Sequence, residues 1–234
     1  MKVAVIGTGN VGTQFARIFD TVPISSRTLE GLSQDADLYI LSVSDSAVRE
    51  VADRLPVLNG FVAHTTGSVA MDVLSEVRCK GYGVIYPFQT LSKARVLLPS
   101  SIPLLIEGNC QDTVDKIEKC AREYGFTKIE YADSEKRRKV HLCGAFACNF
   151  TNALIGISQK ILSDSDIDIS VINPLVEETV EKLKSIPAKD AQTGPAARKD
   201  LSTLRAHKTL LNELRMGKET EIYDIISEYI MSTR

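Results

Sequence analysis

The sequence contains few of the residues that hold a fold together covalently or through metals. It has no tryptophan, three histidines and five cysteines in 234 residues, and the cysteines stand at positions 79, 110, 120, 143 and 148. Their number is odd and no Cys-x-x-Cys pair occurs, whereas disulfide frameworks and zinc sites use even or closely spaced sets. We therefore expect reduced thiols, no metal site and a cytoplasmic location.

Long apolar runs and an excess of one charge are also missing. The net charge is −2, which gives no electrostatic reason to expect nucleic acid or an anionic membrane as a partner. No apolar run approaches the length that spans a bilayer, and residues 1 and 2 lead directly into the first hydrophobic segment without a leader. We expect a globular protein of one large or two modest domains, without a membrane segment.

The strongest motif stands at the beginning of the chain. Residues 2–6, Lys-Val-Ala-Val-Ile, are typical of a buried parallel strand. Gly-Thr-Gly-Asn-Val-Gly follows at 7–12, with glycines at the positions that allow a tight turn, close approach to a pyrophosphate and helix–strand packing. The amides at the start of the next helix would then face an anion.

Taken alone, this glycine pattern is weak, and a turn without a ligand is the alternative. The strand before it and the helical continuation at residues 14–19 favour nucleotide binding. The candidate cofactor-binding residues of this motif are Gly7, Gly9, Asn10, Val11 and Gly12.

The segment at 21–28 is expected to form a second strand and its exit loop. In NAD-binding domains an acidic residue at this strand end holds the ribose, but Asp20 precedes the strand and Glu30 lies beyond the loop. The loop instead offers Ser26, Arg27 and Thr28, which suit a 2′-phosphate and predict NADP as the cofactor. The alternative is that Arg27 is a solvated loop residue.

Two further strands, at 37–43 and 60–64, end in small polar residues. The carboxyl ends of parallel strands are where an α/β sheet meets its ligand. We expect Asp45 to cap the following helix rather than to act as a catalytic carboxylate. His64 can serve either structure or proton transfer. The candidate cofactor-binding residues at these two strand ends are Ser42, Val43, Ser44, His64 and Thr65.

The order of the predicted elements defines the fold class. More strands are expected at 83–85, 102–106 and 127–131, with a helix at 112–124. Strand–helix alternation predicts an α/β fold with an N-terminal Rossmann-type, mostly parallel, doubly wound sheet at 1–132. An all-helical C-terminal domain at 133–234 follows, because helical periodicity replaces the alternation there.

The helical part begins with a stretch, 134–162, that is long enough for one continuous helix. One face carries the apolar residues Phe146, Phe150, Ile157 and Ile161, which we expect to be core. The opposite face carries His141, Ala145, Cys148, Asn149 and Asn152. Small and polar residues in this position predict a pocket, while close helix–helix contact is the alternative.

A loop near the C-terminus supplies another candidate. After a helix at 171–186, Gly-Pro at 194–195 indicates a turn. Arg198 and Asp200 in this loop can pair with each other, cap the next helix or bind a substrate anion. We assign Arg198 to an anionic group of the substrate.

Six segments carry a resemblance to a known family. They are GTGNVG at 7–12, LSVSD at 41–45, HTTGS at 64–68, YPFQT at 86–90, NFTNAL at 149–154 and GPAARKD at 194–200. In this order they resemble Rossmann-like proteins that are provisionally described as NADP oxidoreductases. That group is related to pyrroline-5-carboxylate reductase and ketopantoate reductase within the 6-phosphogluconate dehydrogenase superfamily.

The resemblance implies NADP in the first domain, with the nicotinamide near 42–44 and 64–65, and a substrate between the sheet edge and the helical domain. It also implies a homodimer formed through the helical domain. Two positions depart from the relatives. Ala145 stands where the β-hydroxyacid dehydrogenases require lysine, four residues before Asn149, and Tyr86 stands where these relatives often have histidine.

The combined prediction is an NADP(H)-dependent oxidoreductase that moves hydride to or from a small carbonyl, imine or alcohol substrate. His141 is the candidate acid/base, Asn149 or Asn152 orients the substrate, and Arg198 holds an anionic group. The alternative from another class is a non-catalytic NADP-binding sensor or scaffold, which the missing lysine favours. A reductase with a deazaflavin as second redox partner is a third possibility.

Overall fold

The computed structural model describes residues 1–163 and 165–233. It divides into two compact units, residues 1–149 and 150–234. The sheet ends at residue 131, close to the domain boundary expected between 132 and 133. The first unit nevertheless extends to 149, because the helix that follows the last strand is anchored to the sheet through Arg137.

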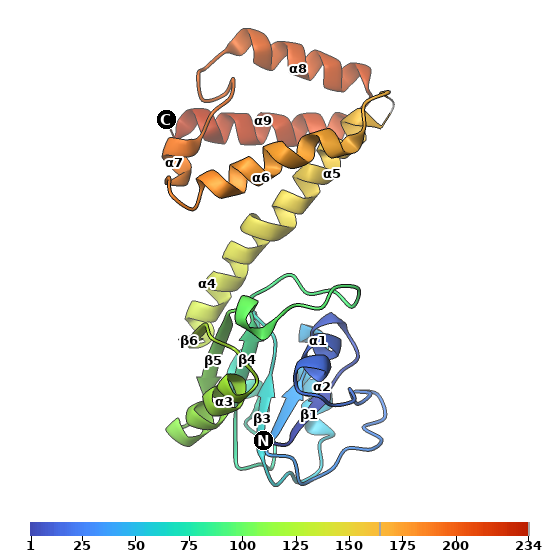
Figure 1. Ribbon diagram of the computed structural model, residues 1–234, viewed down its shortest axis with the longest axis vertical. Coiled ribbons are helices and arrows are strands. Elements are labelled where there is room, and N and C mark those ends of the chain that lie inside the picture. Colours follow the sequence, from blue (N-terminus) through green and yellow to red (C-terminus); the bar gives the residue numbers. More distant parts are fainter. Residues whose placement is uncertain (164, 234) are drawn as a thin grey trace. The chain divides into compact units, whose positions relative to one another are not determined.

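The first unit is built on one six-stranded sheet in which spatial order follows chain order (Figure 1). All neighbouring pairs are parallel except β4 and β5, which are antiparallel. The strands are β1 (Val3–Ile6), β2 (Leu38–Leu41), β3 (Phe61–His64), β4 (Gly81–Pro87), β5 (Leu104–Gly108) and β6 (Ile129–Tyr131). The expected mostly parallel sheet is therefore confirmed.

Helices cover both faces of this sheet. α1 (Asn10–Ile18) and α3 (Gln111–Glu123) pack on one face and α2 (Val48–Asp53) on the other, while α4 (Ser134–Gly144) follows the last strand. Short 3-10 turns are η1 (Asp45–Ala47), η2 (Met71–Leu74) and η3 (Pro99–Ser101). Figure 1 shows α3 beside β4 and β5.

Alternation along the strands sorts the core into two layers, because successive side chains of a strand point to opposite faces. Val3 and Val5 of β1 pack with α1 and α3 in one cluster. Ala4 and Ile6 pack with α2 and η2 in the other. A strand that is buried on both faces is expected to be mostly apolar, as β1 and β2 are, whereas β3 ends in the buried His64. The doubly wound architecture predicted from the sequence is thus confirmed.

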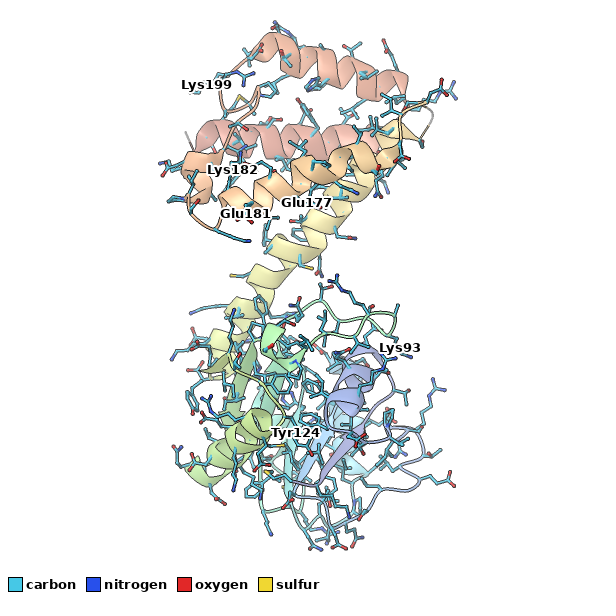
Figure 2. The ribbon with its side chains drawn as sticks, in the orientation of Figure 1. Lys93, Tyr124, Glu177, Glu181, Lys182 and Lys199 are labelled. Carbon is cyan, nitrogen blue, oxygen red and sulfur yellow. The ribbon has the colours of Figure 1, made fainter. Side chains whose placement is uncertain are left out.

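Two hydrogen bonds between distant residues fix the edges of this unit. Tyr124, which follows α3, donates from its hydroxyl to the carbonyl of Met1 over 2.9 Å. Arg17 of α1 donates to the carbonyl of Lys93 over 2.9 Å. Figure 2 labels Tyr124 and Lys93. The bonds connect the C-terminal ends of α1 and α3 to segments that are remote in sequence.

The expected second strand at 21–28 is reduced to a single bridge. Ile24 pairs with Ile6, donating to the carbonyl of Val5 and accepting from the amide of Gly7, each over 2.8 Å. Pro23 has no amide proton, so the segment cannot continue a ladder of hydrogen bonds.

The second unit consists of helices. They are α5 (Thr151–Leu162), η5 (Ile169–Ile172), α6 (Asn173–Lys182), α7 (Ala188–Ala191), α8 (Leu201–Glu213) and α9 (Gly217–Ser232). Figure 1 shows α8 and α9 as an antiparallel pair joined by a short turn. Among the described residues from 150 onward, few side chains are buried: Ala196, Leu204, Leu211, Met216 and Ser227.

The helix expected over 134–162 is present with an interruption, since residues 145–150 form a π-helical turn, η4 (Ala145–Phe150). The expectation that its apolar face is core was wrong. Phe146 is 65% exposed and Phe150 is 51% exposed, because helical periodicity identifies an apolar face but not what covers it.

The expectation that no segment is long and apolar enough to span a bilayer was also wrong, because one helix meets both criteria. The 29-residue helix Ser134–Leu162 contains an 18-residue window of mean hydropathy 1.4, and none of that window is buried. One such helix is weak evidence for a membrane protein, because a helix that packs against protein can meet the same criteria.

Candidate functional site

A large groove lies in the first unit at the carboxyl ends of the parallel strands. We name it the main groove; its volume is about 890 Å³. It extends from the loop after Ile24, across the ends of β1, β2 and β3, to Tyr86 on β4. Four strand spacings of about 4.8 Å correspond to about 19 Å, so the groove suits an extended ligand.

The three motif glycines differ in how much space the surrounding protein leaves for a side chain. A Cβ at Gly7, where φ is +125°, would lie 2.1 Å from the carbonyl oxygen of Ser42. A Cβ at Gly12 would lie 2.0 Å from the carbonyl oxygen of Gly7. A Cβ at Gly9 would meet no protein atom within 4 Å. The fold therefore requires Gly7 and Gly12, whereas Gly9 stands open at the start of α1 on the main groove.

Two guanidinium groups lie at the Ile24 end of the main groove. Arg27 is exposed there and makes no ion pair in the part of the chain that the structure describes. Arg54, after α2, donates to the carbonyl of Ser26 over 3.3 Å and to that of Arg27. It also lies 3.8 Å from the carboxylate of Glu50. Arg54 thus fixes the loop that carries Arg27, although no motif in the sequence indicates this role.

Polar groups from the next two strands line the middle of the main groove. The hydroxyl of Ser42 is buried and has no hydrogen-bond partner among the described residues. The hydroxyl of Thr65 donates to the carbonyl of Leu41 over 3.4 Å. Asp45 accepts a hydrogen bond from Ser68 instead of capping the following helix as we expected. This contact connects the loop after β2 with the loop after β3.

His64 is fully buried at the end of β3. Its Nδ1 accepts from the amide of Thr66 over 3.2 Å, and its Nε2 has no partner among the described residues. Burial, and secondarily the positive charge of Arg137, lower the pKa of this imidazole to about 4. His64 is therefore neutral near pH 7 and belongs to the framework behind the main groove rather than to its lining.

Tyr86 and His141 form a hydrogen-bonded pair at the other end of the main groove. The Tyr86 hydroxyl lies 2.9 Å from Nδ1 of His141, and their rings meet edge to face. Burial, with a smaller effect of Asp45, raises the pKa of Tyr86 above its usual value, so its hydroxyl stays protonated. The imidazole lies directly over Gly67, where an added Cβ would be 2.5 Å from Nδ1.

The pair is held in place by a buried ionic cluster one turn earlier on α4. Arg137 is fully buried and binds Glu107 of β5 through an ion pair. It also donates to the carbonyl of Val69, and Ser134 donates to Glu107 over 3.0 Å. Removing one member would leave an unpaired buried charge, which is strongly destabilising. The cluster therefore fixes the start of α4, and with it His141, against the loop after β3.

A second cavity, which we name the side pocket, adjoins this pair and has a volume of about 300 Å³. The π-helical turn contributes one wall, a feature that is frequent at functional sites. The lining residues are Tyr86, Phe88, Gln89, Thr90, His141, Gly144, Ala145, Ala147, Cys148 and Asn149. Tyr86 and His141 are the lining residues shared by the side pocket and the main groove.

Most of the predicted cofactor-binding residues come together. Those that line the main groove are Gly7, Gly9, Asn10, Val11, Ser26, Arg27, Ser42, Val43, Ser44 and Thr65. Gly12, Thr28 and His64 lie outside its lining. Of the predicted catalytic residues, His141 lines both cavities and Asn149 lines the side pocket.

Asn152 and Arg198 belong to the second unit. Arg198 is exposed and makes no ion pair with Asp200. Asp200 instead caps α8, accepting from the amide of Thr203 over 3.1 Å. Hydrogen bonds from Thr203 and Ser202 hold the pKa of this carboxyl far below its usual value.

The sequence matches the profile of a protein family described as a domain of unknown function, DUF2520, over residues 102–230. No curated protein matches it significantly. The matched range is more than half of the chain.

Solved structures resemble the chain over nearly its whole length. One is a Bacteroides fragilis protein, BF3122, named provisionally as an NADP oxidoreductase: it is 28% identical, with a TM-score of 0.85 and coverage of 98% of this chain and 97% of that one. Protein TM1727 from Thermotoga maritima is 19% identical (TM-score 0.72; 99% and 97% covered). The 1-pyrroline-5-carboxylate reductase of Streptococcus pyogenes is 13% identical (TM-score 0.59; 99% and 98% covered). These likenesses confirm the Rossmann-like fold expected from the resemblance.

Proposed function

The chain belongs to the DUF2520 family, whose function is unknown, and from this premise we propose that it is an NADP(H)-dependent oxidoreductase. Its substrate would be a small carbonyl, imine or alcohol. The proposal is supported by the main groove, by the polar pair at one end of it and by the name of the Bacteroides fragilis relative. We also propose a cytoplasmic location.

The proposal of nucleotide binding rests mainly on the empty space beside Gly9. Gly7 and Gly12 are needed by the fold, but a Cβ at residue 9 would meet none of the described protein atoms within 4 Å. A glycine at that position fits a pyrophosphate that approaches the backbone at the start of α1. The buried, unpartnered hydroxyl of Ser42 on the same groove offers a further polar contact. The residues present therefore fit a dinucleotide.

The loop at 26–27 supports NADP over NAD. Arg27 and Arg54 supply two guanidinium groups where NAD-binding domains place a carboxylate. Guanidinium groups bind phosphate through charge-assisted, often bidentate hydrogen bonds. Arg27 would bind the 2′-phosphate, and Arg54 would hold the loop and add positive charge.

The bound nicotinamide would supply the hydride, and the protein would orient the substrate and manage a proton at its heteroatom. Tyr86 is suited to donate that proton because its protonated side chain lines both the main groove and the side pocket. His141, hydrogen-bonded to it over 2.9 Å, would return a proton to the Tyr86 oxygen. Asn149 in the side pocket would orient the substrate. This pair takes the place of the lysine that Ala145 replaces.

The main rival is an NADP-binding sensor without chemistry. A polar pair shared by two cavities is unexpected in such a protein, so the pair favours the enzyme. A deazaflavin-using reductase would need a wide cleft beside the nicotinamide. The side pocket, at about 300 Å³, is at the lower limit of ligand sites of about 300–1,000 Å³ and favours a small substrate.

We further propose that a second copy of the chain covers the helical unit. Five buried residues among those described from 150 onward are too few to stabilise this unit alone. Large apolar side chains on three helices are exposed, among them Leu154, Val180 and Ile225. The stretch 142–159 also has no charged residue. An isologous dimer would bury these faces against each other.

The dimer is tested by light scattering on the full chain. We expect a dimer that Ile225→Glu weakens, because Ile225 is a large apolar side chain that is 67% exposed on α9. Glu76→Lys, at an exposed residue of the first unit, is the control that should leave the dimer intact. A monomer, or a protein found in the membrane fraction, would contradict this proposal.

The cofactor is tested by titration with NADPH and NADH. Because the chain has no tryptophan, the fluorescence of the reduced nicotinamide itself reports binding. We expect NADPH to bind more tightly, and equal affinity or tighter NADH would contradict the preference. Catalysis is tested by NADPH oxidation with a panel of ketones, imines and keto acids. Tyr86→Phe is expected to lower kcat by about 100-fold without weakening NADPH.

A further inference from the structure

The composition of the side pocket defines a class of substrate. We propose that this pocket receives the reacting substrate and selects molecules that carry no charge beside the reacting centre, that is, neutral ketones, aldehydes or imines. This inference rests on the proposed function, because it concerns the substrate of the same reaction.

The position of the side pocket supports its role. Tyr86 and His141 line it and the main groove, so a molecule in the side pocket contacts the pair that we assign to proton transfer. The hydroxyl–imidazole hydrogen bond of 2.9 Å lies at this junction. A ligand there can meet both the proton donor and the contents of the main groove.

The lining of the side pocket has no ionised group to match an anion. Among the described residues, none of its ten lining positions is lysine, arginine, aspartate or glutamate. Transfer of a carboxylate from water into such a pocket without a cationic partner is unfavourable, because the free energy of desolvation is large. The guanidinium groups of Arg27 and Arg54 line the main groove at its Ile24 end, whereas the side pocket adjoins β4.

Arg137 does not supply the missing charge. Its charge influences the pKa of Tyr86, but its side chain is fully buried. Its guanidinium is already engaged by the carboxylate of Glu107 and by the carbonyl of Val69. It therefore has no exposed face to offer to a substrate carboxylate.

The groups that do line the side pocket suit a neutral, partly apolar molecule. Phe88 forms an aromatic wall with Tyr86, their ring centroids being 6.3 Å apart. The amide of Gln89 is engaged on both sides, by the carbonyl of Ser101 and the amide of Thr90. Asn149 offers an uncharged donor and acceptor. The pocket thus combines apolar walls with neutral hydrogen bonding.

The test compares two ligands that differ in one group: phenylacetone, a neutral ketone, and phenylpyruvate, the corresponding keto acid. Binding of each to the NADP⁺-loaded protein is measured by calorimetry, and turnover is followed by NADPH oxidation. We expect phenylacetone to bind at least about tenfold more tightly, because the keto acid must desolvate its carboxylate. Tighter binding of phenylpyruvate, or no binding of either ligand, would overturn the inference.

Two variant pairs locate the effect in the side pocket. Thr90→Lys adds a cation to the lining and should shift the preference toward phenylpyruvate, whereas Thr90→Met, of similar length, should not. Gly144→Ala places a Cβ 2.8 Å from the Phe88 ring and should weaken the binding of phenylacetone. A Cβ at Gly217 would meet none of the described atoms within 4 Å, so Gly217→Ala should leave that binding unchanged. Unchanged ligand binding in Thr90→Lys and Gly144→Ala would overturn the assignment of the pocket.

The binding measurement separates this inference from the proposed function. Selective binding of phenylacetone without NADPH oxidation would contradict the oxidoreductase and support the pocket's selectivity. Oxidation of NADPH with phenylpyruvate preferred over phenylacetone would support the oxidoreductase and contradict the inference.

Discussion

Gly67, in the loop after β3, packs directly against the imidazole of His141 on α4. A Cβ at position 67 would lie 2.5 Å from Nδ1 and 2.6 Å from Cγ of that ring. The imidazole is thereby held where Nδ1 meets the Tyr86 hydroxyl. The absence of a side chain at residue 67 is a condition for this hydrogen bond.

We therefore expect Gly67→Ala to displace His141 from Tyr86 and to lower kcat by at least about tenfold, since positioned acid–base groups contribute about 10²–10⁴-fold. With three histidines in the chain, imidazole NMR signals can follow the displacement. Gly217→Ala is the matched control, because a Cβ there would meet none of the described atoms within 4 Å. Unchanged His141 signals and unchanged turnover in Gly67→Ala would contradict this role.

Gly9→Ala should separate ligand binding from folding. A methyl group at residue 9 meets no protein atom within 4 Å, so the melting temperature should be almost unchanged while the Kd for NADPH rises at least about tenfold. Gly7→Ala should instead destabilise the protein by about 1–3 kcal/mol from backbone strain alone, with a clash against Ser42 in addition. Thermal unfolding and NADPH titration of both variants check this contrast. Normal NADPH affinity in Gly9→Ala would argue against a pyrophosphate at this turn.

The fold of the first unit could be predicted because its signals are local. Short apolar strands and a glycine motif between strand and helix specify a doubly wound sheet, and both core layers follow from alternation along β1. The prediction of a strand at 21–28 was wrong, because Pro23 has no amide proton and the pairing with β1 is limited to one bridge at Ile24. The apolar face at Phe146 was recognised, but a single sequence does not say what covers such a face.

The candidate site was predicted only in part because its contacts join distant positions. Tyr86 and His141 are 55 residues apart, and no periodicity links them. The signal for Tyr86 in the sequence is that it stands where the relatives often have histidine. In the sequence Arg54 is simply a charged residue at the end of a predicted helix. Its contact with the loop at 26–27 could not be predicted, because the fold brings these distant positions together.

The Arg54–Glu50 contact predicts opposite effects on NADPH binding. Arg27→Met should weaken NADPH by about 1.5–3 kcal/mol through loss of a charge-assisted contact, and should leave NADH nearly unaffected. Arg54→Met should weaken NADPH as well, because it releases the loop and removes a positive charge. Glu50→Gln should strengthen NADPH, since it removes a negative charge 3.8 Å from Arg54. Titrations with NADPH and NADH measure all three, and equal losses for both cofactors would exclude a 2′-phosphate contact.

His64 gives a prediction for stability against pH. Burial lowers the pKa of its imidazole to about 4 in the folded protein, against an ordinary value of 6.5. Between these values the unfolded chain binds a proton that the folded chain does not, so the free energy of unfolding decreases as pH falls from about 6.5 toward 4. The full difference is about 3 kcal/mol as an order of magnitude.

The contribution of neutral His64 to the free energy of unfolding is therefore complete above about pH 6.5 and is lost progressively as the pH falls toward 4. His64→Asn keeps an acceptor near the amide of Thr66 but does not titrate, so its free energy of unfolding should fall less over the same interval. Denaturant unfolding of both proteins from pH 7.5 to 4.5 measures the difference, in which the titration of carboxyl groups common to both cancels. Because the neighbouring charges of Arg137 and Asp45 act on His64 in opposite directions, burial remains the dominant cause. A constant difference between the two proteins across this interval would show that His64 is protonated equally in the folded and unfolded states.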